Sequence, residues 1–201
     1  MTIIFVLLSI QALMGAFDNL WHHELVAKLP QRISARYELT LHAAREAIYS
    51  IIFIGLAWFE WRGAWAAVLA TLLIAELGIT LADFVEEDRT RRLPALERVL
   101  HTLLTISYGL FLGLIAPILW HWSQQETIMA ASSHGWFSGL LTFYGIGVLA
   151  WSIRNALAVQ TVGRLFQPEV PTIRHGRITP AVLVTGATGF IGAALIRQLA
   201  I

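Results

Sequence analysis

The sequence contains no cysteine, only one lysine and little charge of either sign. Without cysteine there can be no disulfide, thiolate ligand or cysteine nucleophile, so any metal site must use histidine and carboxylates. Charged residues make up 13% of the chain and hydrophobic residues 57%, whereas soluble domains carry about 25% charged residues. The net charge of +1 offers no basic surface for nucleic acid. The composition therefore predicts an integral membrane protein whose partner is the lipid bilayer, with no nucleic-acid partner.

Five apolar stretches approach the roughly 20 residues that a helix needs to cross a bilayer. The uncharged part of the second, residues 48–59, is too short, so this helix must extend back through Glu46, Arg45 and His42. The first lacks the positive residues that open a signal peptide, so we expect it to be retained rather than cleaved. The predicted fold class is an all-α bundle of about five transmembrane helices within residues 1–166, with spans at 2–17, 39–59, 63–83, 99–120 and 136–159.

Basic residues and tryptophans predict the orientation of these helices. The loops alternate between basic and poor in basic residues, and Arg89, Arg91 and Arg92 mark one of the basic loops. Basic loops favour the cytoplasmic side. This predicts an inner or plasma membrane protein with its N-terminus outside and its C-terminus in the cytoplasm. Tryptophans favour the membrane interface, and six are expected at or near the outer face: Trp58, Trp61, Trp65, Trp120, Trp122 and Trp136.

A second unit is predicted after the helices. Residues 167–180 contain three prolines and form an expected linker. Residues 181–201 then give a buried strand, a glycine turn and a helix, the start of a Rossmann fold that the sequence leaves truncated. In this turn, three glycines allow tight bending and close approach of the backbone to a pyrophosphate at the helix N-terminus. The expected cofactor contacts are Gly186, Thr188, Gly189, Phe190, Ile191 and Gly192.

The order strand, turn and helix, with the sequence Val-Thr-Gly-Ala-Thr-Gly-Phe-Ile-Gly, resembles the extended short-chain dehydrogenase/reductase family, the NAD-dependent epimerase/dehydratases. The resemblance covers residues 181–199 only. It implies that a full-length form binds NAD or NADP. The family's catalytic tyrosine, followed four residues later by lysine, has no counterpart, because Lys28 is the only lysine and position 24 is not tyrosine. The catalytic residues are therefore unknown.

Ionisable residues gather at the predicted cytoplasmic ends of the helices. Glu38, His42 and Glu46 are each four residues apart and share one helix face, as do Glu97 and His101. Ionisable groups inside a span are expensive and suggest function, and nitrogen and oxygen ligands suit Fe, Mn or Zn. The candidate metal ligands are His22, His23, Glu38, His42, Glu46, Glu76, Asp83, Glu97 and His101. We expect Glu46, Glu76 and His101 to face the interior, within reach of one another and of His42.

Two alternatives to a metal or catalytic site remain open. The same residues can form a structural polar network, or they can be charges at the helix ends that reach the interface. Three functions follow. One is a membrane-anchored NAD(P)-dependent epimerase/dehydratase-like oxidoreductase with a lipid-soluble substrate or redox partner. Another is a membrane-embedded, metal-dependent oxidoreductase that receives electrons from the NAD(P) domain. The last is a membrane anchor or interaction module without enzymatic activity.

Overall fold

The computed structural model describes residues 1–165, and side chains as far as residue 161. The predicted linker at 167–180 and the predicted nucleotide turn at 181–201 lie outside the described residues. Within the described part, five helices are long and apolar enough to cross a membrane. They are α1 (Thr2–Phe17), α2 (Arg36–Trp58), α3 (Ala64–Thr90), α4 (Ala95–Ser123) and α5 (Trp136–Leu165). The expectation of an all-α fold with five long apolar helices is confirmed.

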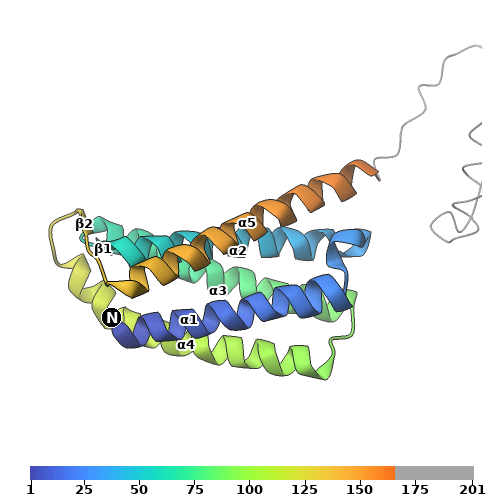
Figure 1. Cartoon of the computed structure of the whole chain (residues 1–201), viewed down its shortest axis with the longest axis horizontal. Helices are drawn as coiled ribbons and strands as arrows, with labels where there is room; N and C mark the ends of the chain where they lie inside the picture. Colours follow the sequence, from blue (N-terminus) through green and yellow to red (C-terminus); the bar gives the residue numbers. More distant parts are fainter. Residues whose placement is uncertain (166–201) are drawn as a thin grey trace, which may run out of the picture. The chain divides into compact units, whose positions relative to one another are not determined.

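Consecutive helices run in alternating directions, so the described part has two ends (Figure 1). At one end, near the N-terminus, the short strands β1 (Phe59–Trp61) and β2 (Met129–Ala131) pair antiparallel. At the other end, a π-helical segment, Asp18–Val26, continues α1, and two short 3₁₀ turns, Leu29–Gln31 and Ile33–Ala35, lead into α2. We call the two ends the strand end and the polar end. Helix α2 packs mainly against α5, and α1 packs against α4.

At the strand end, the loop between α2 and α3 contacts the loop between α4 and α5. Gly63, between β1 and α3, has φ +59°, which favours glycine. A Cβ atom at Gly63 would lie 2.5 Å from the Cα of Thr127. The hydroxyl of Thr127 accepts a hydrogen bond from the backbone N–H of Ala64 at 3.1 Å, which satisfies a free donor in the first turn of α3. This close approach fixes where α3 begins.

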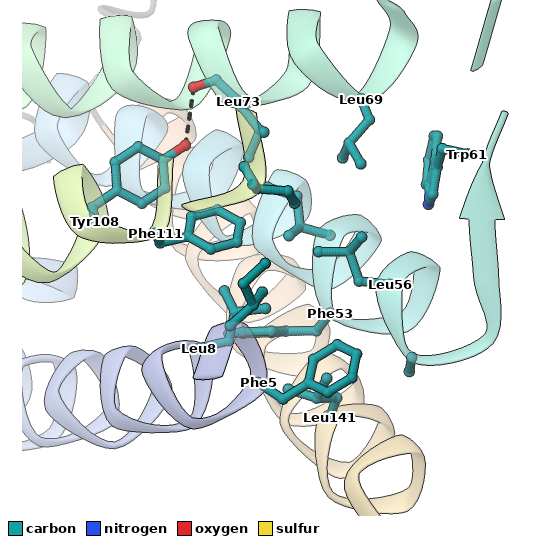
Figure 2. Packing of buried hydrophobic residues seen from close by; sticks show 14 of the residues in the cluster. Phe5, Leu8, Phe53, Leu56, Trp61, Leu69, Leu73, Tyr108, Phe111 and Leu141 are labelled. Atoms are coloured by element: carbon teal, nitrogen blue, oxygen red, sulfur yellow. Dashed lines mark hydrogen bonds between the residues drawn. The ribbon is translucent and has the colours of Figure 1, made fainter. Parts of the chain in front are cut away.

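The apolar core draws side chains from all five helices (Figure 2). Phe5 of α1, Phe53 of α2, Leu69 of α3, Phe111 of α4 and Leu141 of α5 are at most 2% exposed. The polar atom of Tyr108 is satisfied inside the core, because its hydroxyl donates to the carbonyl oxygen of Leu73 at 2.9 Å. Large apolar side chains also cover the outside of the helices, among them Ile3, Ile74 and Phe143. Such a surface suits contact with lipid.

The six tryptophans expected at one face all lie in or near the elements of the strand end. They divide into two kinds. Trp120 and Trp136 are about 70% exposed, at 72% and 68%. By contrast, Trp61 and Trp122 are 5% exposed. The first pair suits an interface with lipid headgroups, whereas the second pair packs inside the bundle. The orientation of the helices across a membrane stays a prediction from the basic loops.

Close packing of α2 against α5 depends on Gly145, where a Cβ atom would meet Ile54 at 2.6 Å. We expect Gly145→Ala to destabilise the protein by about 1–3 kcal/mol through overpacking. The matched control is Gly139→Ala on the same helix, where no described atom lies within 4 Å of the added Cβ. The control is expected to be neutral or slightly stabilising, because alanine favours helix. Unfolding in mixed detergent micelles, followed by circular dichroism, compares them, and equal stabilities would contradict the packing argument.

Candidate metal centre

The polar end of the bundle buries an unusual number of ionisable side chains. The described residues there come from the π-helical segment, the first turns of α2, the last turns of α3 and the start of α4. Eleven histidine and carboxylate side chains of the described bundle are at most 8% exposed: Asp18, His22, His23, Glu38, His42, Glu46, Glu76, Asp83, Glu87, Glu97 and His101. Burial of so many charges is costly unless they are paired or bind a metal. The contacts of these side chains therefore decide whether this end of the molecule is a network of ion pairs or a metal site.

The π-helical segment explains how α1 brings three of these residues together. In a π-helix the backbone bonds run from residue i to i+5, so residues four and five positions apart lie nearly above one another. His22 and His23 are four and five residues after Asp18. His22 Nδ1 donates to Asp18 Oδ1 at 2.7 Å, and His23 Nε2 lies 3.6 Å from Asp18 Oδ2. Single turns of π-helix occur often at functional sites.

Four side chains converge around Asp18 in what we call the Asp18 group: Asp18, His23, Glu97 and His101. One donor atom from each lies within 4.8 Å of the other three. His101 Nε2 lies 2.9 Å from Asp18 Oδ2, and His23 Nε2 lies 3.6 Å from Glu97 Oε1. Metal–ligand bonds of 2.0–2.2 Å place tetrahedral ligand atoms about 3.4 Å apart. The spacing thus suits a bound transition-metal ion.

The side chains around the Asp18 group hold its ligand atoms in place. The carboxylate of Asp18 accepts from His22 through Oδ1, which leaves Oδ2 towards His23 and His101. His101 Nδ1 lies 3.3 Å from Glu87 Oε2, while Nε2 faces Asp18. A carboxylate behind the outer ring nitrogen is the usual support of a metal-binding histidine, since it fixes the ring and its tautomer. The group therefore has both the donor atoms and the surroundings of a metal site.

Arg91 is the shared partner of three buried carboxylates at this end. Its guanidinium donates to Glu97 at 2.6 and 3.0 Å, to Glu38 at 3.0 and 3.2 Å, and to Glu87 at 3.0 Å. Burial alone would lower the pKa of Arg91, but the hydrogen bonds to Glu97 and the charges of the three carboxylates raise it above its usual value. Arg91 is therefore a fixed positive charge beside the Asp18 group.

A second set of donor atoms overlaps the first, and we call it the Glu38 group: His23, Glu38, His42 and Glu87. His42 is the member of this group least able to bind a metal. The Nδ1 atom of His42 lies 3.1 Å from a guanidinium nitrogen of Arg45 and must accept a hydrogen bond from it, since arginine only donates. The ring proton is then on Nε2, which faces Asp83 Oδ2 at 3.3 Å. No lone pair of His42 is left for a metal, so the Asp18 group is the better site.

The predicted ligands divide into three sets. His23, Glu38, His42, Glu97 and His101 fall in one or both groups. His22 and Asp83 lie beside them, bonded to Asp18 and facing His42. Among the described residues, Glu46 and Glu76 belong to neither group. The carboxylate of Glu46 accepts from Asn19 and Asn155 at 2.9 Å each, and Glu76 accepts from Thr80 at 2.8 Å.

Two members of the groups, Asp18 and Glu87, were not among the predicted ligands. Asp18 directly follows the first apolar stretch, and no role was predicted for it from the sequence. The sequence feature that could have identified Asp18 is its spacing of four and five residues to His22 and His23. Glu87 lies in an acidic run of α3 that reads equally well as a solvated face, but its side chain is fully buried. The sequence feature that could have identified Glu87 is its position four residues after Asp83, on the same helix face.

The Asp18 group borders a cavity of about 370 Å³ inside the bundle. Asp18 and His101 line one part of this cavity, and Glu46 and Glu76 line it as well. Glu46, Glu76 and His101 therefore all face the interior, around one space. Among the described residues, however, no hydrogen bond or ion pair joins them to one another or to His42, so the expected contacts are not formed. The remaining wall is mostly apolar, with Phe53 and other side chains of the helices. A metal ion in the Asp18 group would lie beside this apolar space.

The chain matches no protein-family model, no curated protein and no solved structure. Its functional interpretation therefore depends on the geometry and chemistry of the described residues. The resemblance of residues 181–199 to the epimerase/dehydratases stays a prediction from the sequence.

Proposed function

We propose that the helical part of this protein is a membrane-embedded, metal-dependent oxidoreductase with one divalent ion in the Asp18 group. The main observation in support is that four potential ligand atoms, from the buried side chains of Asp18, His23, Glu97 and His101, lie within 4.8 Å of one another. Two imidazoles and two carboxylates suit Fe, Mn or Zn, and the two redox-active metals of these three suit an oxidoreductase.

The charge of the polar end supports a bound cation. Among the described residues around the two groups, five carboxylates are buried: Asp18, Glu38, Asp83, Glu87 and Glu97. Two guanidinium groups, of Arg45 and Arg91, contact four of these carboxylates. With neutral histidines, as metal binding requires, three negative charges are left over. Without a metal, a second ring proton on His101, between Asp18 and Glu87, offsets one of them. A divalent ion beside Asp18 and Glu97 would offset most of this excess, which is otherwise expensive in a buried site.

The rest of the chain supports the oxidoreductase part of the proposal. Five helices that are long and apolar enough to cross a membrane suit a lipid-soluble substrate. The glycine turn from Gly186 to Gly192 suits a cytoplasmic NAD or NADP domain as the electron source. The basic loops favour the cytoplasmic side for the polar end, which supports an electron source on that side. A second candidate, a membrane-anchored epimerase/dehydratase-like enzyme, is favoured by the glycine turn alone and needs no metal.

Metal analysis of the detergent-purified protein tests the proposal. We expect about one Fe, Mn or Zn ion per chain, by elemental analysis after dialysis against metal-free buffer. His23→Ala and His101→Ala are each expected to lose most of this metal, since each removes one of four ligands. The matched control is His121→Ala, because His121 is an exposed histidine of α4 near the strand end. His121→Ala should keep the wild-type content.

The outcomes separate the candidate functions. Loss of metal in both ligand variants but not in His121→Ala supports the metal-dependent enzyme. Absence of stoichiometric metal in wild-type protein, also after incubation with Fe²⁺, Mn²⁺ and Zn²⁺ in turn, rejects it and leaves a structural polar network. In that case, binding of NAD or NADP by a longer form of the chain, measured by calorimetry, would favour the membrane-anchored epimerase/dehydratase-like enzyme over an anchor without activity.

A further inference from the structure

The cavity beside the Asp18 group has a gap towards the outer surface between α1 and α5. Two contacts frame this gap. Phe5 packs against Phe137 near the strand end, with ring centroids 5.6 Å apart. Nearer the polar end, Arg154 forms an ion pair with Glu24. Between these contacts the two helices present small residues to the cavity.

Small and exposed residues make up the rim of this gap. Gly15 of α1 and Gly147 of α5 both line the cavity. A Cβ atom built on either glycine would meet no described atom within 4 Å. Leu13 and Phe143 also line the cavity and are 58% and 72% exposed, so the wall continues onto the apolar outer surface. We call this opening the α1–α5 window. If the helices cross a membrane, the window opens into lipid.

Inside the cavity, two buried acceptor atoms lack a partner among the described residues. The amide of Gln11 donates to the hydroxyl of Tyr49 at 3.2 Å, which leaves its Oε1 atom unpaired. Glu76 accepts from Thr80 through Oε1, which leaves Oε2 unpaired. Both side chains line the cavity, and Glu76 is only 2% exposed. Because an unpaired buried acceptor is costly, these atoms suit a ligand that donates hydrogen bonds.

We infer that the cavity binds an uncharged, single-chain apolar molecule with a hydroxyl head. The hydroxyl donates its one hydrogen to Glu76, the charged acceptor, and the chain leaves through the α1–α5 window. An anionic head is disfavoured, because three carboxylates line the space, of Asp18, Glu46 and Glu76, whereas the one guanidinium of the described lining, of Arg45, already pairs with Asp83. The volume of about 370 Å³ is at the lower end of the range for small-molecule sites. That this molecule is the substrate of the metal centre rests on the proposed function, whereas its binding does not.

Quenching of tryptophan fluorescence tests the binding. Trp151 of α5 lines the cavity four residues after Gly147, and bromine quenches an indole on contact. The probe is 11-bromoundecan-1-ol, added to the protein in lipid nanodiscs. We expect a saturable quenching component that disappears in Trp151→Phe. The probe 1-bromoundecane, which has no hydroxyl, should bind about tenfold more weakly, since it lacks the hydrogen bond to a charged acceptor. The acid, 11-bromoundecanoate, should bind no better than the alkane.

Matched variants assign the probe to the window. Gly147→Leu should weaken binding of the bromo-alcohol about tenfold or more, because the added side chain fills the opening. Gly139→Leu lies on the same helix, outside the cavity lining, and should stay within about twofold of wild type. Glu76→Gln should remove most of the preference for the alcohol over the alkane. Circular dichroism confirms that each variant is folded.

Two results would overturn the inference. One is equal affinity for the bromo-alcohol and the bromo-alkane in wild-type protein. The other is unchanged binding in folded Gly147→Leu. Metal content measured on the same samples keeps the two proposals apart. Saturable binding without metal supports the cavity and rejects the metal centre, whereas stoichiometric metal without saturable binding does the reverse.

Discussion

Arg91→Met is expected to destabilise the protein by about 3–5 kcal/mol, the usual effect of removing one partner from a buried ion pair. The guanidinium of Arg91 is the shared partner of Glu38, Glu87 and Glu97, and these carboxylates are fully buried. Methionine keeps most of the side-chain length but leaves three carboxylates without their cation. Equilibrium unfolding in mixed micelles, followed by circular dichroism, measures the change in the free energy of unfolding.

The same substitution two positions earlier provides the control. Arg89 has a side chain that is 75% exposed and forms only a 3.7 Å pair with Glu86. Exposed pairs of this kind contribute between about 0 and 1 kcal/mol. Arg89→Met should therefore remain within about 0.5 kcal/mol of wild type. If Arg91→Met were as stable as Arg89→Met, the three carboxylates would not depend on Arg91, and the charge argument for the metal centre would lose its basis.

Much of the helical fold follows from the length of the apolar stretches. The charged residues of the second stretch were predicted to lie inside a helix, because residues 48–59 are too short to cross a bilayer. Helix α2 does begin at Arg36 and carries Glu38, His42 and Glu46 as buried side chains. The ends of the helices were harder to predict. Helix α3 continues to Thr90, seven residues beyond the expected Asp83, because nothing in its acidic run breaks a helix before Pro94.

The grouping of the ionisable residues depended on information that one sequence does not contain. Spacing along a helix places Glu97 and His101 on one face, but the rotation of each helix decides which faces meet. The turn to π-helix at Asp18, which brings His23 towards Glu97, has no simple signal in the sequence. The distinction between His42 and His101 is equally hidden. It depends on which side chain reaches the outer ring nitrogen, an arginine for His42 and a carboxylate for His101.

This distinction leads to the prediction that Glu87→Gln lowers metal affinity by about ten- to a hundredfold, as removal of a carboxylate behind a metal-binding histidine does. One oxygen of Glu87 accepts from Arg91 and the other faces His101 Nδ1. Glutamine has only one acceptor oxygen. Whichever way its amide turns, an N–H group must face either Arg91 or the ring N–H of His101. Competition with a chromogenic chelator measures the dissociation constant of the metal.

Glu38→Gln is the matched control, because Glu38 is also fully buried and also bound to Arg91. Its carboxylate lies near His23, but among the described residues it forms no hydrogen bond or ion pair with a histidine of the Asp18 group. Its metal affinity should stay within about threefold of wild type, a difference worth less than 1 kcal/mol. If Glu38→Gln instead lost the metal while Glu87→Gln kept it, the ion would lie in the Glu38 group, and the tautomer assigned to His42 would be wrong. Equal, small effects of both substitutions would mean that neither carboxylate supports a ligand and that His101 is held by Asp18 alone.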